Sequence, residues 1–191
     1  EVFRHAVQVL RMKPGALLNL FDGQGLEYQA QLEQVDKRQA TVSLKQQIHT
    51  DNESQLDILL MQGISRGERM DYAIQKAVEL GVKRISACEQ SGRSYLPELL
   101  PITSIDAALE NVNDACKLVL DPEAIKSFSS IKKAQQIALL IGPEGGLSEI
   151  EVQRANDAGF TGITLGPRIL RTETASAAAL AMVQAGWGDI A

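Results

Sequence analysis

The chain has 191 residues, of which 45% are hydrophobic and 23% charged, and its formal net charge is −5. No apolar run approaches the roughly 20 residues needed to cross a bilayer, and the N-terminus does not resemble a signal peptide. We therefore expect a soluble cytoplasmic protein. The length suits a module of about 50 residues joined to a larger domain.

The two cysteines, Cys88 and Cys116, give no sign of a metal site. They lie far apart and lack the paired spacing of zinc-binding or redox motifs. We therefore expect two reduced thiols and no structural metal.

The acidic charge balance argues against a nucleic-acid-binding surface that covers the whole molecule, because affinity for a polyanion usually rests on Lys and Arg. The charges are unevenly distributed, however. Residues 1–50 carry six Lys or Arg and five Asp or Glu, whereas residues 51–191 carry thirteen and nineteen. Any contact with RNA would therefore be local, and the N-terminal part is the less acidic one.

The first 50 residues predict a small antiparallel β-barrel or meander. A short helix is expected at residues 5–10. Three β-rich segments follow, separated by turn signals at residues 22–25 and 36–38, and they are residues 16–21, 27–32 and 40–44. The polar stretch at residues 49–54 has little to bury and is the predicted linker.

A boundary near Asn52 divides the chain into residues 1–52 and residues 53–191. Beyond it, strands and helices alternate, which predicts an α/β domain with a parallel sheet. Its first unit is a buried strand at residues 56–61 and an amphipathic helix at residues 68–80, and Gly81 is placed to end that helix.

A glycine-rich loop follows an apolar run at residues 137–141, which has the length of a buried parallel strand. This first loop is Gly142-Pro143-Glu144-Gly145-Gly146. Ser148 and Glu151 then form a capping-box pattern, which predicts a helix that ends at Gly159. Alone, the loop is equally consistent with an ordinary tight turn between strand and helix.

A second loop, residues 166–171, follows a short strand predicted at residues 163–165 and precedes a helix predicted at residues 173–185, which Thr172 can cap. Taken singly, the arginines of the loop are typical of surface charge. Glu173 is typical of a residue that interacts with the helix dipole, and the alanines are typical of any stable helix. Taken together, the small residues of this helix permit close packing against another element or subunit, with the arginines held beside the first loop.

Both loops follow the C-terminal end of a strand and precede a helix, which is where open α/β sheets bind their ligands. Glycines let the backbone approach a ligand closely. The first loop lacks the Lys of the phosphate-binding loop and the spacing of the dinucleotide fingerprint. The pattern therefore predicts a ligand site that is not one of the common nucleotide sites.

The segments that contain these loops, Leu140–Ser148 and Leu165–Ala175, resemble the two signature segments of the ribosomal small-subunit methyltransferase E (RsmE) family. Supporting matches cover nearly the whole chain, at residues 5 and 9–12, 75–82, 89–93 and 117–124. The stretches at residues 82–87 and 108–117 are shorter than the resemblance implies.

The resemblance implies an N-terminal PUA-like β-barrel that binds RNA and a C-terminal SPOUT domain with a deep trefoil knot. It further implies a homodimer with S-adenosylmethionine bound near the subunit interface. The implied reaction is transfer of the cofactor's methyl group to N3 of a uridine in the decoding region of 16S ribosomal RNA. The expected substrate is the assembled 30S subunit, and neither DNA nor a membrane is an expected partner.

The expected cofactor-binding residues come from the two loops and their flanks: Leu140, Ile141, Gly142, Gly145, Gly146, Leu165, Gly166, Arg168, Ile169, Leu170, Thr172 and Ala175. Arg171 is the candidate for stabilising charge on the uracil carbonyls. Glu144 and Glu173 are candidates for a base if burial raises their pKa, and each is also a candidate for bracing an arginine. The candidate RNA contacts are His5, Arg11, Lys13 and Arg93.

Two other classes of protein stay open on this pattern. One is a non-catalytic RNA-binding protein that kept the fold, which the two intact loops disfavour. The other is a nucleotide-binding α/β enzyme unrelated to RNA, which would be favoured if the first 50 residues did not form a separate module.

Overall fold

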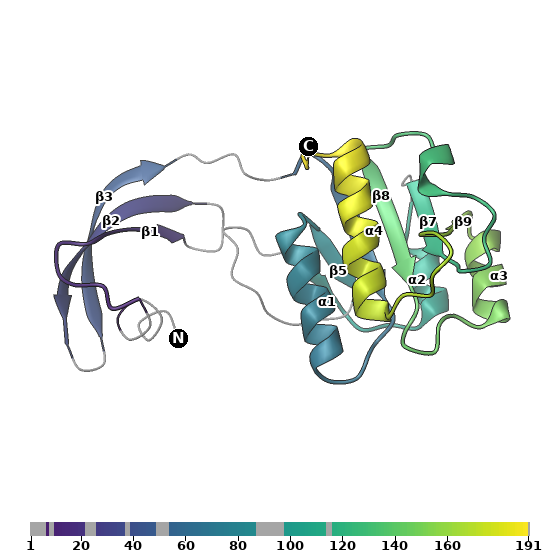
Figure 1. The fold of residues 1–191 in the computed structure, drawn as a ribbon, viewed down its shortest axis with the longest axis horizontal. Coiled ribbons are helices and arrows are strands. Elements are labelled where there is room, and N and C mark those ends of the chain that lie inside the picture. Colours follow the sequence, from purple (N-terminus) through teal and green to yellow (C-terminus); the bar gives the residue numbers. More distant parts are fainter. Residues whose placement is uncertain are drawn as a thin grey trace. The chain divides into compact units, whose positions relative to one another are not determined.

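The computed structural model describes residues 7, 10–21, 26–36, 39–48, 54–86, 98–113 and 116–190. The chain divides into two compact units: residues 1–52 with 92–95, and residues 53–91 with 96–191. Figure 1 shows the elements of both units in chain order. We describe each unit by itself.

The first unit contains a three-stranded antiparallel sheet in the order β1-β2-β3. Leu17 of β1 lies opposite Gln31 of β2, and Glu27 of β2 lies opposite Ile48 of β3. The bounds are β1 Leu17–Phe21, β2 Glu27–Val35 and β3 Ala40–Ile48. The three predicted strands are therefore confirmed, and β2 and β3 run longer than expected. The turns predicted at residues 22–25 and 36–38 and the helix predicted at residues 5–10 fall largely outside the described residues.

The second unit is built on a parallel sheet of six strands, in the order β6-β5-β4-β8-β7-β9. This confirms the predicted α/β domain with a parallel sheet. The strands are β4 Asp57–Gln62, β5 Arg84–Ser86, β6 Glu98–Leu100, β7 Cys116–Leu120, β8 Gln136–Ile141 and β9 Thr161–Ile163. The two central strands, β4 and β8, are apolar because both faces of the sheet are covered.

Helices cover the sheet on both faces. The helices are α1 Glu68–Glu79, α2 Ile105–Glu110, α3 Glu149–Asp157 and α4 Thr172–Trp187, with a 3-10 turn, η2, at Phe128–Ser130. In Figure 1, α4 runs beside α1, and the cores show that these two helices share one face. The other face packs against α2 and α3. Within the described residues, no helix combines the length and apolar character needed to span a membrane.

Strand β8 divides its side chains between the two cores, because successive residues of a strand point to opposite faces. Ile137, Leu139 and Ile141 join the core under α1 and α4. Ala138 and Leu140 join the core under α2 and α3. The end of β8 is therefore held from both sides, which gives the first glycine loop a rigid base.

The predicted helix ends are confirmed at three places. Ser148 caps α3 in a full capping box, with its Oγ accepting from the Glu151 backbone N–H and the Glu151 carboxylate accepting from the Ser148 N–H at 2.7 Å. Gly159 follows α3 with φ +88°, and Gly81 follows α1 with φ +81°. Both glycines adopt the left-handed conformation that commonly ends a helix.

Near the second loop, one predicted strand is present with shifted bounds, and one predicted helix cap is wrong. The strand predicted at residues 163–165 lies at Thr161–Ile163. Gly162 weakened the β signal of this segment in the sequence, but pairing with β7 stabilises its extended backbone. Thr172 is not the N-cap of α4, because Arg171 takes that position and Thr172 is the first helical residue. The Thr172 hydroxyl instead donates to the Gly142 carbonyl, so a tertiary contact has displaced the local one.

Candidate functional site

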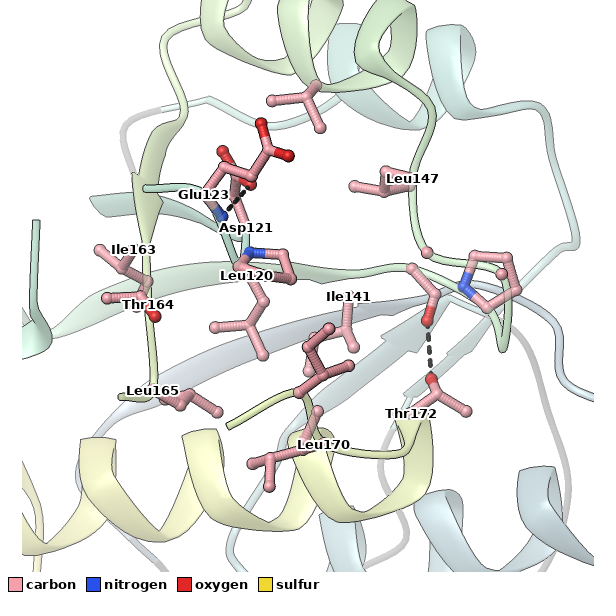
Figure 2. Close-up of a pocket in the computed structure, with 18 of the residues that line it drawn as sticks. Leu120, Asp121, Glu123, Ile141, Leu147, Ile163, Thr164, Leu165, Leu170 and Thr172 are labelled. Carbon is pink, nitrogen blue, oxygen red and sulfur yellow. Dashed lines mark hydrogen bonds between the residues drawn. The ribbon is translucent and has the colours of Figure 1, made fainter. Parts of the chain in front are cut away.

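A cavity of about 530 Å³ lies where strands β7, β8 and β9 end. Its wall combines the segment after β7, both glycine loops and the first turn of α4. Figure 2 shows the apolar part of this wall, which includes Leu120, Ile141, Ile163, Leu165 and Leu170. The volume lies within the range of small-molecule sites, about 300–1,000 Å³. The cavity also lies at the edge of the sheet where open α/β folds bind ligands.

The first loop has a fixed backbone. The Gly146 N–H donates to the Pro143 carbonyl at 2.9 Å, and Gly146 has φ +75°, which favours glycine. A Cβ added to Gly142 would lie 2.8 Å from the Leu147 nitrogen, so a side chain there would collide with the loop's own backbone. A Cβ added to Gly145 would meet nothing within 4 Å. The glycines at 142 and 146 are therefore required by the loop itself.

Glu144 is engaged by the segment that follows β4. Its Oε1 accepts from the Arg66 backbone N–H at 2.9 Å and from Arg69 Nη1 at 3.3 Å. The hydrogen bond from the Arg66 backbone is the largest cause that lowers the pKa of Glu144 below its ordinary value, and the neighbouring Arg69 lowers it further. These contacts outweigh the opposing effect of burial on the pKa, so the geometry favours the bracing role over the role of a base.

The second loop leaves most of its residues exposed, and Leu170 is the partly buried one. Ile169 is 87% exposed, and Arg168 and Arg171 are also exposed. Among the described residues, no hydrogen bond or ion pair engages the Arg171 guanidinium. Gly166 has φ +108°, and its carbonyl accepts from the Thr164 hydroxyl at 3.1 Å. Within the part of the chain that the structure describes, the arginine that Glu144 braces is therefore Arg69, after β4, and not an arginine of the second loop.

Most of the expected cofactor-binding residues meet in the cavity wall: Ile141, Gly142, Gly145, Gly146, Leu165, Arg168, Ile169, Leu170, Thr172 and Ala175. Glu144 also lines it. Leu140, Gly166, Arg171 and Glu173 do not, and Leu140 points into the core on the other face. Glu173 Oε2 is buried and lacks a hydrogen-bond partner among the described residues.

The expected RNA contacts belong mainly to the first unit. Arg11 and Lys13 are exposed, and Arg11 has φ +51°. His5 and Arg93 lie outside the described residues.

Several residues of the wall had no role assigned from the sequence. Asp121, Pro122 and Glu123 follow β7 and line the cavity, as does Thr164 after β9. Asp121 Oδ1 accepts from the Glu123 N–H at 2.9 Å, which shapes this turn (Figure 2). The available signal was the position of Asp121-Pro122 directly after an apolar strand, since the ends of parallel strands share one edge of a sheet.

Models of two protein families match this chain. A model described as an RNA methyltransferase domain matches residues 52–86 and 84–184. A model described as an RNA methyltransferase PUA domain matches residues 1–45. The two matches together cover both structural units.

Curated relatives and solved structures agree with these models. The ribosomal RNA small subunit methyltransferase E of Buchnera aphidicola subsp. Acyrthosiphon pisum is 32% identical, with 97% of this chain and 86% of that protein covered. That of Bacillus subtilis is 28% identical over 96% of this chain and 87% of that protein. The crystal structure of this enzyme from Neisseria gonorrhoeae, bound to S-adenosylmethionine, has a TM-score of 0.88 and 39% identity, covering 100% of this chain and 91% of that chain. The chain belongs to the ribosomal RNA small subunit methyltransferase E family of RNA methyltransferases.

Proposed function

We propose that this protein transfers the methyl group of S-adenosylmethionine to N3 of a uridine in the decoding region of 16S ribosomal RNA. The proposed substrate is the assembled 30S subunit in the cytoplasm. The observation that carries the proposal is the cavity at the carboxyl ends of β7, β8 and β9, which both glycine loops line. A relative with 39% identity holds S-adenosylmethionine in its crystal structure, which supports the choice of cofactor.

The residues of the cavity fit the chemistry of this cofactor. An apolar wall made by Ile141, Leu165 and Leu170 suits the adenine ring. Asp121 and Glu123 provide carboxylate oxygens, which accept hydrogen bonds from ribose hydroxyls or from an ammonium group. The backbones of the two loops supply further hydrogen-bond donors and acceptors, and their glycines have no side chain that would block the cofactor.

The bound cofactor supplies an electrophilic methyl group on a sulfonium. The reaction forms a bond between N3 and the methyl carbon, breaks the bond from that carbon to sulfur, and releases the N3 proton. The chain's main task is to align the two reactants, since correct positioning removes much of the entropic barrier. The exposed Arg171 guanidinium would stabilise the negative charge that develops on the uracil carbonyls.

We assign neither acidic candidate the role of a base. The low pKa of Glu144 and its hydrogen bonds to Arg66 and Arg69 favour a role in holding the first loop. Glu173 does not line the cavity, and its position in the first turn of α4 suits an interaction with the helix dipole. The N3 proton then passes to solvent. A pH profile of single-turnover methylation that lost a titration step in Glu173→Gln would contradict this assignment.

RNA would be held mainly by the first unit, through Arg11 and Lys13 and through His5 and Arg93. The match of residues 1–45 to the PUA domain model supports this division, as does the charge distribution. Under the proposal, residues 1–52 fold as the PUA-like barrel and residues 53–191 form the knotted SPOUT domain. A protein that lacks residues 1–52 should bind S-adenosylmethionine but not RNA. Equal RNA binding by the truncated and full chains would refute the division.

We also propose a homodimer in which α4 lies near the subunit interface. Ala177, Ala178 and Ala181 are partly exposed on this helix, and such small side chains allow close approach of a second copy. An Ala178→Trp protein should dissociate at a higher protein concentration than the wild type in sedimentation velocity. A wild-type protein that is monomeric at micromolar concentration would exclude the dimer.

The decisive experiment is methylation of a defined substrate. The protein is incubated with labelled S-adenosylmethionine and 30S subunits from a strain that lacks the modification, and the labelled nucleotide is mapped. Incorporation at N3 of one uridine is the expected result, with free 16S RNA as a poorer substrate. Label in another base would refute the proposed target, and absence of any incorporation would favour the non-catalytic RNA-binding protein.

A further inference from the structure

A buried cluster of polar side chains lies beneath the cavity. It consists of Gln62, Thr172 and Ser176, which are 5%, 6% and 0% exposed. Gln62 is the last residue of β4, and the other two belong to the first turns of α4. Of the three, Thr172 alone lines the cavity. Buried polar groups are costly unless their hydrogen bonds are satisfied, so a cluster of three calls for an explanation.

The donors and acceptors of this cluster fix the orientation of the Gln62 amide, although the Ser176 hydroxyl also lies 2.9 Å from the Thr172 carbonyl as a second acceptor. The Gly142 carbonyl can only accept, so the Thr172 hydroxyl donates its single proton to it, at 2.6 Å (Figure 2). Thr172 Oγ1 therefore accepts from Gln62 Nε2, at 3.1 Å. The same amide nitrogen donates to the Gly63 carbonyl at 3.1 Å, and Gln62 Oε1 accepts from the Ser176 hydroxyl.

The Gln62 amide thus connects three segments of the chain. It binds directly to the turn after β4 and to the start of α4, and it reaches the first glycine loop through the Thr172 hydroxyl. The turn after β4 has no room to move toward the loop, because a Cβ added to Gly63 would lie 2.5 Å from the Pro143 nitrogen. In a tightly packed interior of low dielectric constant, such a network holds its members in one relative position.

We propose that Gln62 is a positioning residue for the cofactor site. Acting through Thr172, its side-chain amide fixes the Gly142 carbonyl relative to the first turn of α4. Gly142, Thr172 and Ala175 all line the cavity. The position of the Gly142 carbonyl relative to α4 therefore sets the shape of the site. The inference rests on the proposed function, because it takes S-adenosylmethionine as the ligand of the cavity.

A second buried glutamine, on α4 itself, provides a matched control. Gln184 is 1% exposed. Its Nε2 donates to the Leu80 carbonyl at 2.7 Å, and its Oε1 accepts from the Ser54 hydroxyl at 3.0 Å. It does not line the cavity. Gln62 and Gln184 therefore share side-chain chemistry, burial and a direct link to α4, and they differ in their connection to the first glycine loop.

The test compares Gln62→Met with Gln184→Met in the full-length protein. Calorimetry measures the Kd for S-adenosylmethionine, and thermal unfolding measures Tm. Both variants should lower Tm, since each leaves buried partners unsatisfied. Only Gln62→Met should weaken cofactor binding, by about tenfold or more, which corresponds to about 1.4 kcal/mol. Equal Kd values for Gln62→Met and the wild type, or equal losses in the two variants, would overturn the inference.

Thr172→Val keeps the test decisive if Gln62→Met does not fold, because it removes one hydroxyl at nearly constant volume. It should weaken cofactor binding more than Thr172→Ser does. Where Gln62→Met folds, adding Thr172→Val to it should change the Kd little, since both changes break the same path from Gln62 through the Thr172 hydroxyl to the Gly142 carbonyl. Wild-type affinity in Thr172→Val would also overturn the inference. A wild-type protein that does not bind S-adenosylmethionine would instead refute the proposed function.

Discussion

The two glycine loops that line the cavity differ in how they are held. The first loop is closed by its own backbone, braced by Glu144 and tied to α4 through the Gly142 carbonyl. The second loop has a hydrogen bond from Thr164 to the Gly166 carbonyl and exposes Arg168, Ile169 and Arg171. The comparison indicates a division of labour. Under the proposed function, the first loop would offer a fixed backbone to the cofactor, while the exposed side chains of the second loop would face the RNA or a second subunit.

Removing the guanidinium of Arg171 should have the largest effect, because this side chain belongs to the loop assigned to the substrate. If Arg171 stabilises charge that develops during methyl transfer, Arg171→Ala should lower kcat by about 10²–10³. The Kd for S-adenosylmethionine should change little, since the side chain is exposed and does not line the cavity. Arg171→Lys should recover little activity, because an ammonium lacks the planar fork of the guanidinium.

The measurements for Arg171 are single-turnover methylation and calorimetry on the same preparations. A joint loss of cofactor affinity and Tm would show that Arg171 supports the loop instead. Normal methylation by Arg171→Ala would exclude both roles.

Gly142→Ala should have the next largest effect on cofactor binding, because the added methyl group would collide with the backbone of the first loop. The added Cβ would lie 2.8 Å from the Leu147 nitrogen and 2.9 Å from the Gly146 carbonyl carbon, both of which are backbone atoms. Overpacking of this kind costs about 1–3 kcal/mol, which corresponds to roughly 5- to 150-fold in cofactor affinity.

Gly145→Ala is the matched control for Gly142→Ala, since its Cβ would meet nothing within 4 Å in the same loop. Its effect on the Kd for S-adenosylmethionine should be clearly smaller. If calorimetry gives equal losses for the two variants, the first loop is not the rigid element that the comparison requires.

Replacing Glu144 should have the smallest effect, because a glutamine oxygen can still accept from the Arg66 N–H and only the exposed pair with Arg69 is lost. The side chains of that pair are 51% and 30% exposed, so solvent screens it, and we expect Glu144→Gln to weaken cofactor binding less than about tenfold.

The lowered pKa of Glu144 predicts how the difference in Kd between Glu144→Gln and the wild type depends on pH. The carboxylate's contribution is fully present above the ordinary carboxyl pKa and is lost as the pH falls through the lowered value. The ratio of the two Kd values should therefore stay constant from pH 8 to pH 6. A change across that range would show that Glu144 titrates there, as a base would.

Local patterns were enough to predict most of the fold. The alternating segments of the first unit, the apolar run of β8, the capping box at Ser148 and the glycine after each of α1 and α3 depend on short-range chemistry. They were therefore visible in neighbouring residues. The position of β9 was not, because pairing with β7 across the sheet overcomes the weak β propensity of Gly162.

The sequence by itself determined which loops line the cavity, since each glycine-rich segment stands between a strand and a helix. Only the tertiary structure decided what their side chains do. Thr172 has the residue type of an N-cap, yet its hydroxyl donates to Gly142, 30 residues away. Gln62 lies 110 residues from Thr172 and carries no local signal. Hydrogen bonds between distant segments depend on the packing of the sheet against α4, and no short-range pattern encodes that packing.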